Sequence, residues 1–178
     1  MPESAVVIPV PEAEVVVAGW RARYDPEAVV ANVPAHITLL YPFLEPDRLD
    51  ADVEAALAAL FGAESPFDLT LAGLCAFPDI LYLAPEETAP FVRLTRLLSE
   101  RFALLPYGGR FAEVVPHLTI GTNPGLADVA AVASEASEHW RAGHLPIKPA
   151  VIRAALMEQD ERGRWSIRRW LPLGAAAG

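Results

Sequence analysis

Cysteine and lysine are almost absent from this chain of 178 residues, which contains one of each, Cys75 and Lys148. A single cysteine excludes an intrachain disulfide, and we interpret Cys75 as a small core residue. A chain with so little cysteine is typical of a reducing compartment, so we expect a cytoplasmic protein.

Long apolar runs are absent as well. No stretch approaches the roughly 20 apolar residues that cross a bilayer. The N-terminus has no basic segment before an apolar one, and Pro9 and Pro11 interrupt its only apolar run. We therefore expect neither a membrane span nor a secretory signal.

Positive charge is scarce and scattered, and the formal net charge is −9. Stable binding to duplex nucleic acid relies on many cationic contacts to phosphates, and this chain has no basic run that would supply them. A pocket for one or two phosphates needs only a few local donors. The charge therefore excludes a long duplex as a partner and leaves small phosphorylated molecules.

The chain has ample apolar residues for a core: 53% are hydrophobic and 21% are charged. This composition predicts one compact domain, which we expect to be a monomer, covering residues 1–178. Residues 173–178 have no apolar side chain after Leu173 except alanine, and we expect this tail to fray.

Hydrophobic periodicity predicts an alternation of strands and helices that occurs twice. The first half, about 4–77, predicts strands at 5–10, 36–41 and 67–74 and helices at 12–24 and 47–61, the second helix capped by Asp47. The second half, about 78–172, predicts strands at 80–83, 117–121, 147–158 and 165–171 and helices at 86–102 and 126–140. Each half is β-α-β-α-β, with one more strand closing the second, so we interpret the halves as pseudo-repeats.

One tetrapeptide pattern occurs at the same step of both halves. His36-Ile37-Thr38-Leu39 recurs 81 positions later as His117-Leu118-Thr119-Ile120. Because successive side chains of a strand point to opposite faces, the histidine and threonine of each copy share a face. Each copy therefore offers an imidazole and a hydroxyl side by side.

Two such surfaces around one cavity suit acid–base chemistry at phosphorus. A neutral histidine removes a proton from an attacking hydroxyl or water, while a charged histidine protonates the leaving oxygen. Threonine hydroxyls hold the non-bridging oxygens. This chemistry needs no metal, and no carboxylate or cysteine ligands lie beside the motifs, so we expect neither metal nor cofactor.

The paired His-x-Thr-x motifs, with Val33-Pro34-Ala35 and Val115-Pro116 before them, resemble the two-histidine (2H) phosphoesterase superfamily, in particular its 2′-5′ RNA ligase and cyclic phosphodiesterase branch. The resemblance implies an α+β, bilobal fold in which two mainly antiparallel sheets face a central cleft, with helices outside. It implies metal-independent chemistry on a 2′,3′-cyclic phosphate or a 2′-5′ phosphodiester of a nucleotide or short RNA end. It also implies that His36, Thr38, His117 and Thr119 are catalytic.

Other candidate residues depend only on their position in the sequence. Phe43 and Tyr107 are candidates for stacking on a base, and Arg110 for pairing with a phosphate. Arg110 is equally compatible with an ordinary loop cation. Trp20, Arg21 and Arg23, near the end of the first predicted helix, are candidates for the rim of the cleft.

Three interpretations of the motifs stay open. Either motif alone fits a core histidine beside a common strand-forming residue, whereas the matched pair favours a catalytic site. A non-catalytic module that binds a nucleotide or phosphate would use the same cleft. An RNA-end ligase would use the same residues in the reverse direction.

Overall fold

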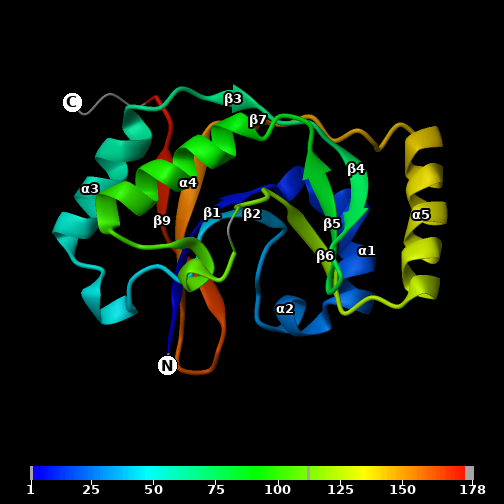
Figure 1. Cartoon of the computed structure of the whole chain (residues 1–178), viewed down its shortest axis with the longest axis horizontal. Coiled ribbons are helices and arrows are strands. Elements are labelled where there is room, and N and C mark those ends of the chain that lie inside the picture. Colours follow the sequence, from blue (N-terminus) through cyan, green and yellow to red (C-terminus); the bar gives the residue numbers. More distant parts are fainter. Residues whose placement is uncertain (1, 112, 175–178) are drawn as a thin grey trace.

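The computed structural model describes residues 2–111 and 113–174 and has the predicted α+β class (Figure 1). A seven-stranded antiparallel sheet has the order β4-β5-β6-β2-β1-β8-β9, and a two-stranded sheet pairs β3 with β7. The strands are β1 (Ser4–Pro9), β2 (His36–Leu40), β3 (Phe67–Asp68), β4 (Leu71–Ala76), β5 (Ile80–Pro85), β6 (Leu118–Thr122), β7 (Ala150–Val151), β8 (Arg153–Gln159) and β9 (Trp165–Pro172).

The described part of the chain has five α-helices. They are α1 (Glu14–Tyr24), α2 (Pro26–Val30), α3 (Ala51–Gly62), α4 (Ala89–Phe102) and α5 (Leu126–Arg141). Helix α4 packs against β2, α1 against β6 and α3 against β9. Figure 1 shows α3 and α4 over the β1–β8–β9 side of the molecule, and α1 and α5 beside β4, β5 and β6. Every helix among residues 2–111 and 113–174 is too short or too polar to span a bilayer.

The two strands that carry the motifs meet at the centre of the large sheet. Strands β2 and β6 are antiparallel and join through one residue pair, Ile37 and Leu118. The two groups of strands expected as separate facing sheets, β4-β5-β6 and β2-β1-β8-β9, are therefore linked into one sheet at this point. The pairing removes an exposed edge from each group, which is the physical reason for the link.

The strand order is symmetric about this central pair. Exchanging β1, β2 and β4 with β5, β6 and β8 turns the order β4-β5-β6-β2-β1-β8 into its own reverse. A duplicated β-α-β-α-β unit predicts this behaviour, with β9 as the added strand. The order is therefore consistent with the interpretation of two pseudo-repeats.

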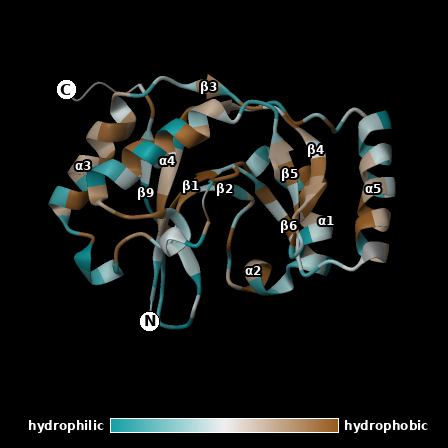
Figure 2. Ribbon diagram, in the orientation of Figure 1, coloured by the Kyte–Doolittle hydropathy of each residue, from teal (hydrophilic) through white to brown (hydrophobic). Residues whose placement is uncertain are grey.

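Alternation along the motif strands separates the core from the site. Ile37 and Leu39 of β2, and Leu118 and Ile120 of β6, are buried in the core with at most 1% of their surface exposed. The helices contribute large side chains to the same core, including Trp20. Figure 2 shows the hydrophobic colour concentrated along central strands such as β1 and β5. The histidines and threonines of the motifs therefore point away from the core, to the opposite face of the sheet.

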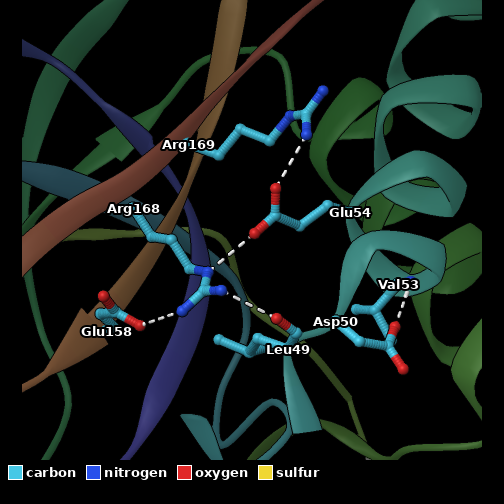
Figure 3. A network of polar contacts seen from close by, with 7 residues as sticks. All are labelled: Leu49, Asp50, Val53, Glu54, Glu158, Arg168 and Arg169. Carbon is cyan, nitrogen blue, oxygen red and sulfur yellow. Dashed lines mark hydrogen bonds and ion pairs between the residues drawn. The ribbon is translucent and has the colours of Figure 1, made fainter. Parts of the chain in front are cut away.

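Some local predictions differ from the structure. Asp47 lies in a short 3-10 turn, Pro46–Arg48, and the helix that it was expected to cap begins at Ala51. Asp50 is the N-cap instead, because its Oδ1 accepts a hydrogen bond of 2.9 Å from the Val53 N–H (Figure 3). Each of two predicted strands, 67–74 and 147–158, is divided between the small sheet and the large one.

The expected tail and the expected core cysteine also need correction. Leu173 is buried, and its N–H donates a hydrogen bond of 2.9 Å to the Ile152 carbonyl. The expected fraying therefore does not begin at Leu173. Residues 175–178 lie outside the described residues. Cys75 is only half-buried, on β4 opposite Tyr82, because the edge strand leaves that face uncovered.

Candidate active site

The register between β2 and β6 brings the four motif side chains together. Extending the antiparallel pair of Ile37 and Leu118 by one residue each way sets His36 opposite Thr119 and Thr38 opposite His117. Residues directly opposite share a face, with Cβ atoms about 4.5–5.5 Å apart, and the two histidines stand on the diagonal, about 7–8 Å apart. The structure thus places all four predicted residues on one face.

His36 has one ring nitrogen fixed by the backbone. Its Nδ1 lies 2.8 Å from the Pro34 carbonyl oxygen, and its Nε2 lies 3.2 Å from Thr38 Oγ1. Because a carbonyl oxygen only accepts, Nδ1 carries the proton and Nε2 of the neutral ring is an acceptor. The nitrogen available for taking a proton therefore faces the motif.

His117 repeats the backbone contact in different surroundings. Its Nδ1 lies 2.7 Å from the Val115 carbonyl oxygen, so Nε2 is again the nitrogen left for chemistry. Its ring contacts the edges of two aromatic rings, Phe77 at 5.8 Å and Tyr82 at 5.5 Å between centroids. Phe77 stacks on Tyr82 at 4.6 Å. Aromatic side chains, not polar ones, are thus the main neighbours of this imidazole.

Both imidazoles are held in the neutral form more strongly than a free histidine. Burial lowers the pKa of His36 to about 4, against the opposing effect of its hydrogen bond to Pro34. The charges of Arg21 and His117 lower the pKa of His36 further. Burial also lowers the pKa of His117, against the hydrogen bond to Val115. Near neutral pH, His36 is therefore a free base, as a proton acceptor must be.

The structure brings Tyr107 and Arg110 to the motif. Tyr107 lies in the 3-10 turn Pro106–Gly109, and its N–H donates a hydrogen bond of 2.6 Å to the Tyr41 carbonyl, just after β2. Burial raises the pKa of the Tyr107 hydroxyl, and a hydrogen bond with Thr38 opposes the shift. Arg110 is exposed, and its charge acts on the Tyr41 hydroxyl. Both predicted binding residues thus lie near the first motif.

Phe43 is not brought to the motif face. Its ring is buried in the core and packs edge-on against Phe102 at 4.9 Å between centroids. No face of the ring is left for a base, so Phe43 is removed from the candidate stacking residues. The sequence showed only that Phe43 follows the first motif, and the direction of its side chain depends on the turn after β2.

The expectation that Trp20, Arg21 and Arg23 reach the cleft rim is not met either. Trp20 is buried in the core, and its indole N–H donates a hydrogen bond of 2.8 Å to Glu135. Arg21 is buried and donates hydrogen bonds to Glu14 and to the Val33 carbonyl. Arg23 forms an exposed ion pair with Glu135 of α5 at 2.6 Å. Both arginines bind groups of the protein itself: Arg21 binds Glu14 of its own helix and the Val33 carbonyl, and Arg23 binds Glu135 of α5.

Sequence reasoning missed the aromatic side chains around the motifs. A row of edge-to-face contacts runs from Trp165 through Tyr41 and Tyr107 to Phe111, with centroids 6.3, 6.4 and 5.5 Å apart. Phe111 is exposed at one end. The row joins three segments that lie far apart in the sequence, so only Tyr107, a candidate from its place in the sequence, could be expected there. Alternation along the strand at 80–83 does predict that Tyr82 points to the face opposite that of the buried Leu81 and Leu83.

Metal donors are not gathered near these residues or elsewhere in the described parts of the chain. Within residues 2–111 and 113–174, no three histidine, cysteine, aspartate or glutamate side chains form a group that would hold an ion. A hollow of about 470 Å³ lies beside the segment that leads into β2, lined in part by Arg21, Val33, Pro34 and Trp165.

Comparison with known proteins gives relatives that match nearly the whole chain. Residues 9–163 match the model of the 2′-5′ RNA ligase superfamily. A curated Bacillus cereus (strain G9842) protein named "Putative phosphoesterase" is 32% identical over 164 residues, which cover 88% of this chain and 87% of the relative.

Solved structures share the fold. Escherichia coli LigT complexed with NADP+ has a TM-score of 0.60 and 23% identity and covers 96% of both chains. LigT complexed with 3′-AMP has a TM-score of 0.60 and 22% identity, covering 97% of this chain and 99% of the other. With the match to the superfamily model, these likenesses confirm the resemblance drawn from the paired motifs: the chain belongs to the 2′-5′ RNA ligase superfamily of two-histidine phosphoesterases.

Proposed function

We propose that this protein is a metal-independent phosphodiesterase acting on a 2′,3′-cyclic phosphate or a 2′-5′ phosphodiester of a nucleotide or short RNA end. The single observation that carries the proposal is the diagonal pair of imidazoles, His36 and His117, on the same face of two paired strands. Each turns Nε2 toward that face because its Nδ1 is bound to a backbone carbonyl. Membership of a phosphoesterase superfamily supports the class of reaction.

The proposed reaction on a cyclic phosphate is one in-line displacement. One imidazole takes a proton from water while the water oxygen forms a bond to phosphorus. The bond from phosphorus to one ribose oxygen breaks, and the other imidazolium gives that oxygen its proton. Thr38 and Thr119 donate hydrogen bonds to the non-bridging oxygens, whose negative charge grows in the transition state.

We assign the role of base to His36 and of acid to His117. His36 is neutral down to about pH 4, so it is available to accept a proton throughout the physiological range. Burial lowers the pKa of His117, whereas at His36 the charge of Arg21 adds to the effect of burial. A bound phosphate anion beside His117 favours its protonated form. The assignment thus depends on the difference between the two surroundings.

The substrate is proposed to be small. The acidic chain has no basic run for a long duplex, while Arg110 and Tyr107 lie beside the motif for one phosphate and one base. LigT, which shares the fold, has been crystallised with NADP+ and with 3′-AMP. We further propose a monomeric enzyme of the reducing cytoplasm, as its single cysteine suggests.

Turnover without metal tests this proposal. Purified protein is incubated in EDTA with the four nucleoside 2′,3′-cyclic phosphates and with 2′-5′-linked dinucleotides, and products are separated by chromatography. We expect the wild type to convert at least one substrate class, and His36→Ala and His117→Ala to lose about 10²–10⁴-fold in rate. His144→Ala, an exposed histidine near the end of α5, is the matched control and keeps full activity.

Two outcomes overturn the proposal. Equal inactivity of the wild type and both variants over the whole panel, with calorimetry showing tight nucleotide binding, identifies a binding module instead. Activity that disappears in EDTA and returns with a divalent cation shows that the two imidazoles do not suffice.

A further inference from the structure

Arg21 is one of three buried polar or charged residues in the described chain, with 5% of its surface exposed. Its Nη1 donates a hydrogen bond of 3.1 Å to Glu14 Oε1, and its Nη2 donates one to the Val33 carbonyl oxygen. Burying a guanidinium is costly, and apolar residues of similar size are often as stable or more so at such a site. A buried charge here therefore suggests a role in geometry more than in stability.

Glu14 continues this chain of contacts to the other side of Pro34. The same oxygen that binds Arg21, Oε1, accepts a hydrogen bond of 2.9 Å from the Ala35 N–H. Two side chains of one helix thus hold the carbonyl before Pro34 and the N–H after it. Pro34 itself has no N–H, so these flanking bonds are what fixes the orientation of its own carbonyl.

That carbonyl is the acceptor for Nδ1 of His36, at 2.8 Å. The hollow of about 470 Å³ lies against Val33 and Pro34. Backbone bonds hold the neighbouring residues, from Val33 N–H to the Ala28 carbonyl and from Val10 N–H to the Ala35 carbonyl. The hydrogen bonds from α1 are the side-chain bonds that hold the groups on either side of Pro34. Any rotation of this peptide would release the Nδ1 proton and allow it to move to Nε2.

The second motif has no such support in the described part of the chain. There, the only side chain bonded to the backbone of residues 114–116 is that of His117 itself. The residues 81 positions after Glu14 and Arg21 are Thr95 and Phe102, which carry no charge. Side-chain hydrogen bonds from a charged pair therefore hold the backbone before His36 but not the backbone before His117.

We infer that Glu14 and Arg21 are a positioning pair for His36, holding the backbone on both sides of Pro34 so that the proton stays on Nδ1 and Nε2 stays free as the acceptor. The inference deepens the proposed function and rests on the role of His36 as base. The pair touches no reacting atom, and it acts through the peptide of Pro34.

The test is the protonation of His36 by NMR, combined with kinetics. The ¹⁵N shifts of Nδ1 and Nε2 report the tautomer, and the titration of the ring reports its pKa, neither of which requires turnover. In Arg21→Met we expect a mixed tautomer and a midpoint moved upward, because a positive charge that lowers the pKa is removed. We expect kcat to fall about tenfold to a hundredfold, as for residues that orient metal-bound histidines, with KM nearly unchanged.

Arg168→Met is the matched control. Arg168 also bonds to glutamates, Glu54 and Glu158, and to one backbone carbonyl, that of Leu49, but between α3 and the β8–β9 hairpin (Figure 3). Its replacement should leave the His36 tautomer and kcat within about twofold of wild type.

Glu14→Gln keeps the inference testable if Arg21→Met does not fold, because the amide oxygen still accepts from Ala35 and Arg21 but the negative charge that pairs with Arg21 is lost. A partial tautomer shift in this variant supports the positioning role. Unchanged tautomer and titration of His36 in every folded variant overturn it, even if the enzyme is active. If the wild type is inactive and the His36 tautomer still shifts in the variants, the proposed function is refuted and the positioning role is not.

Discussion

The two motifs have the same sequence pattern and the same backbone contact, yet their surroundings differ. Each imidazole gives its Nδ1 proton to the carbonyl two residues earlier. His36 is then surrounded by polar groups, with Thr38 at Nε2 and the Glu14–Arg21 pair behind Pro34. His117 instead lies against the rings of Phe77 and Tyr82.

The repeated strand pattern places the imidazoles of His36 and His117 in equivalent positions, and the residues around each imidazole then give it a different environment. Acid–base catalysis needs one proton donor and one acceptor, so two identical sites would not be enough. A lower pKa at His36 than at His117 is expected because burial lowers the pKa of His36 strongly and the charge of Arg21 adds to this shift. The predictions below test this difference between the motifs.

The largest expected effect comes from removing one histidine at a time with two kinds of leaving group. On a cyclic phosphate, His36→Ala and His117→Ala each lose about 10²–10⁴-fold in kcat/KM. On bis(p-nitrophenyl) phosphate, whose leaving phenolate needs no proton, we expect His117→Ala to lose less than about tenfold and His36→Ala to keep its full loss. Steady-state kinetics on both substrates checks this.

A small loss for His36→Ala and a full loss for His117→Ala on bis(p-nitrophenyl) phosphate would exchange the roles of base and acid. Equal losses on both substrates would show that the two histidines do not divide the work between base and acid. His144→Ala, run beside them, controls for any general effect of removing a histidine.

The pH profile is expected to have an acidic optimum. Activity requires neutral His36 and protonated His117, so kcat/KM falls below about pH 4 and again above the pKa of His117, which burial holds below its usual value near 6.5. Above that value the rate falls about tenfold per pH unit. A maximum in kcat/KM above pH 7.5 would show that the surroundings do not set the two protonation states in this way.

Replacing the hydroxyls should give smaller and unequal losses. Thr119→Val and Thr38→Val keep the side-chain shape and remove one donor to the phosphate, which is worth about tenfold to a hundredfold in kcat. Thr38→Val should also alter the titration of His36, because Thr38 Oγ1 lies 3.2 Å from Nε2. Kinetics and an NMR titration of both variants check this. If the two variants perturb His36 equally, the polar surroundings of the first motif do not depend on Thr38.

The smallest expected effect is on stability. Because the pKa of His36 is about 4 in the folded chain and about 6.5 in the unfolded one, the unfolded state binds the proton first as the pH falls. The free energy of unfolding therefore decreases between about pH 6.5 and 4, by on the order of 2 kcal/mol from this residue. Denaturant unfolding of wild type and His36→Gln at pH 7 and 4.5 measures it. A loss of equal size in both proteins would contradict the burial of His36.

The strands that carry the two motifs can be predicted from the sequence, whereas the side chains that surround them cannot. Alternation and the spacing of the motifs predicted the strands of His36 and His117 and their common face, because these depend on local periodicity. Phe43 was misplaced because the turn after β2 decides the direction of its ring. Arg21 was placed at the rim because its partners, on the same helix and at Val33, become visible only when α1 packs beside the start of β2.

The most direct measurement is an NMR pH titration of the two histidine rings in the wild-type protein, assigned with His36→Gln and His117→Gln. The account predicts that His36 titrates at about pH 4 and His117 at a higher pH that is still below 6.5, with both neutral rings protonated on Nδ1. A His36 that titrates at or above His117, or a neutral ring protonated on Nε2, would contradict the division of roles between the two motifs.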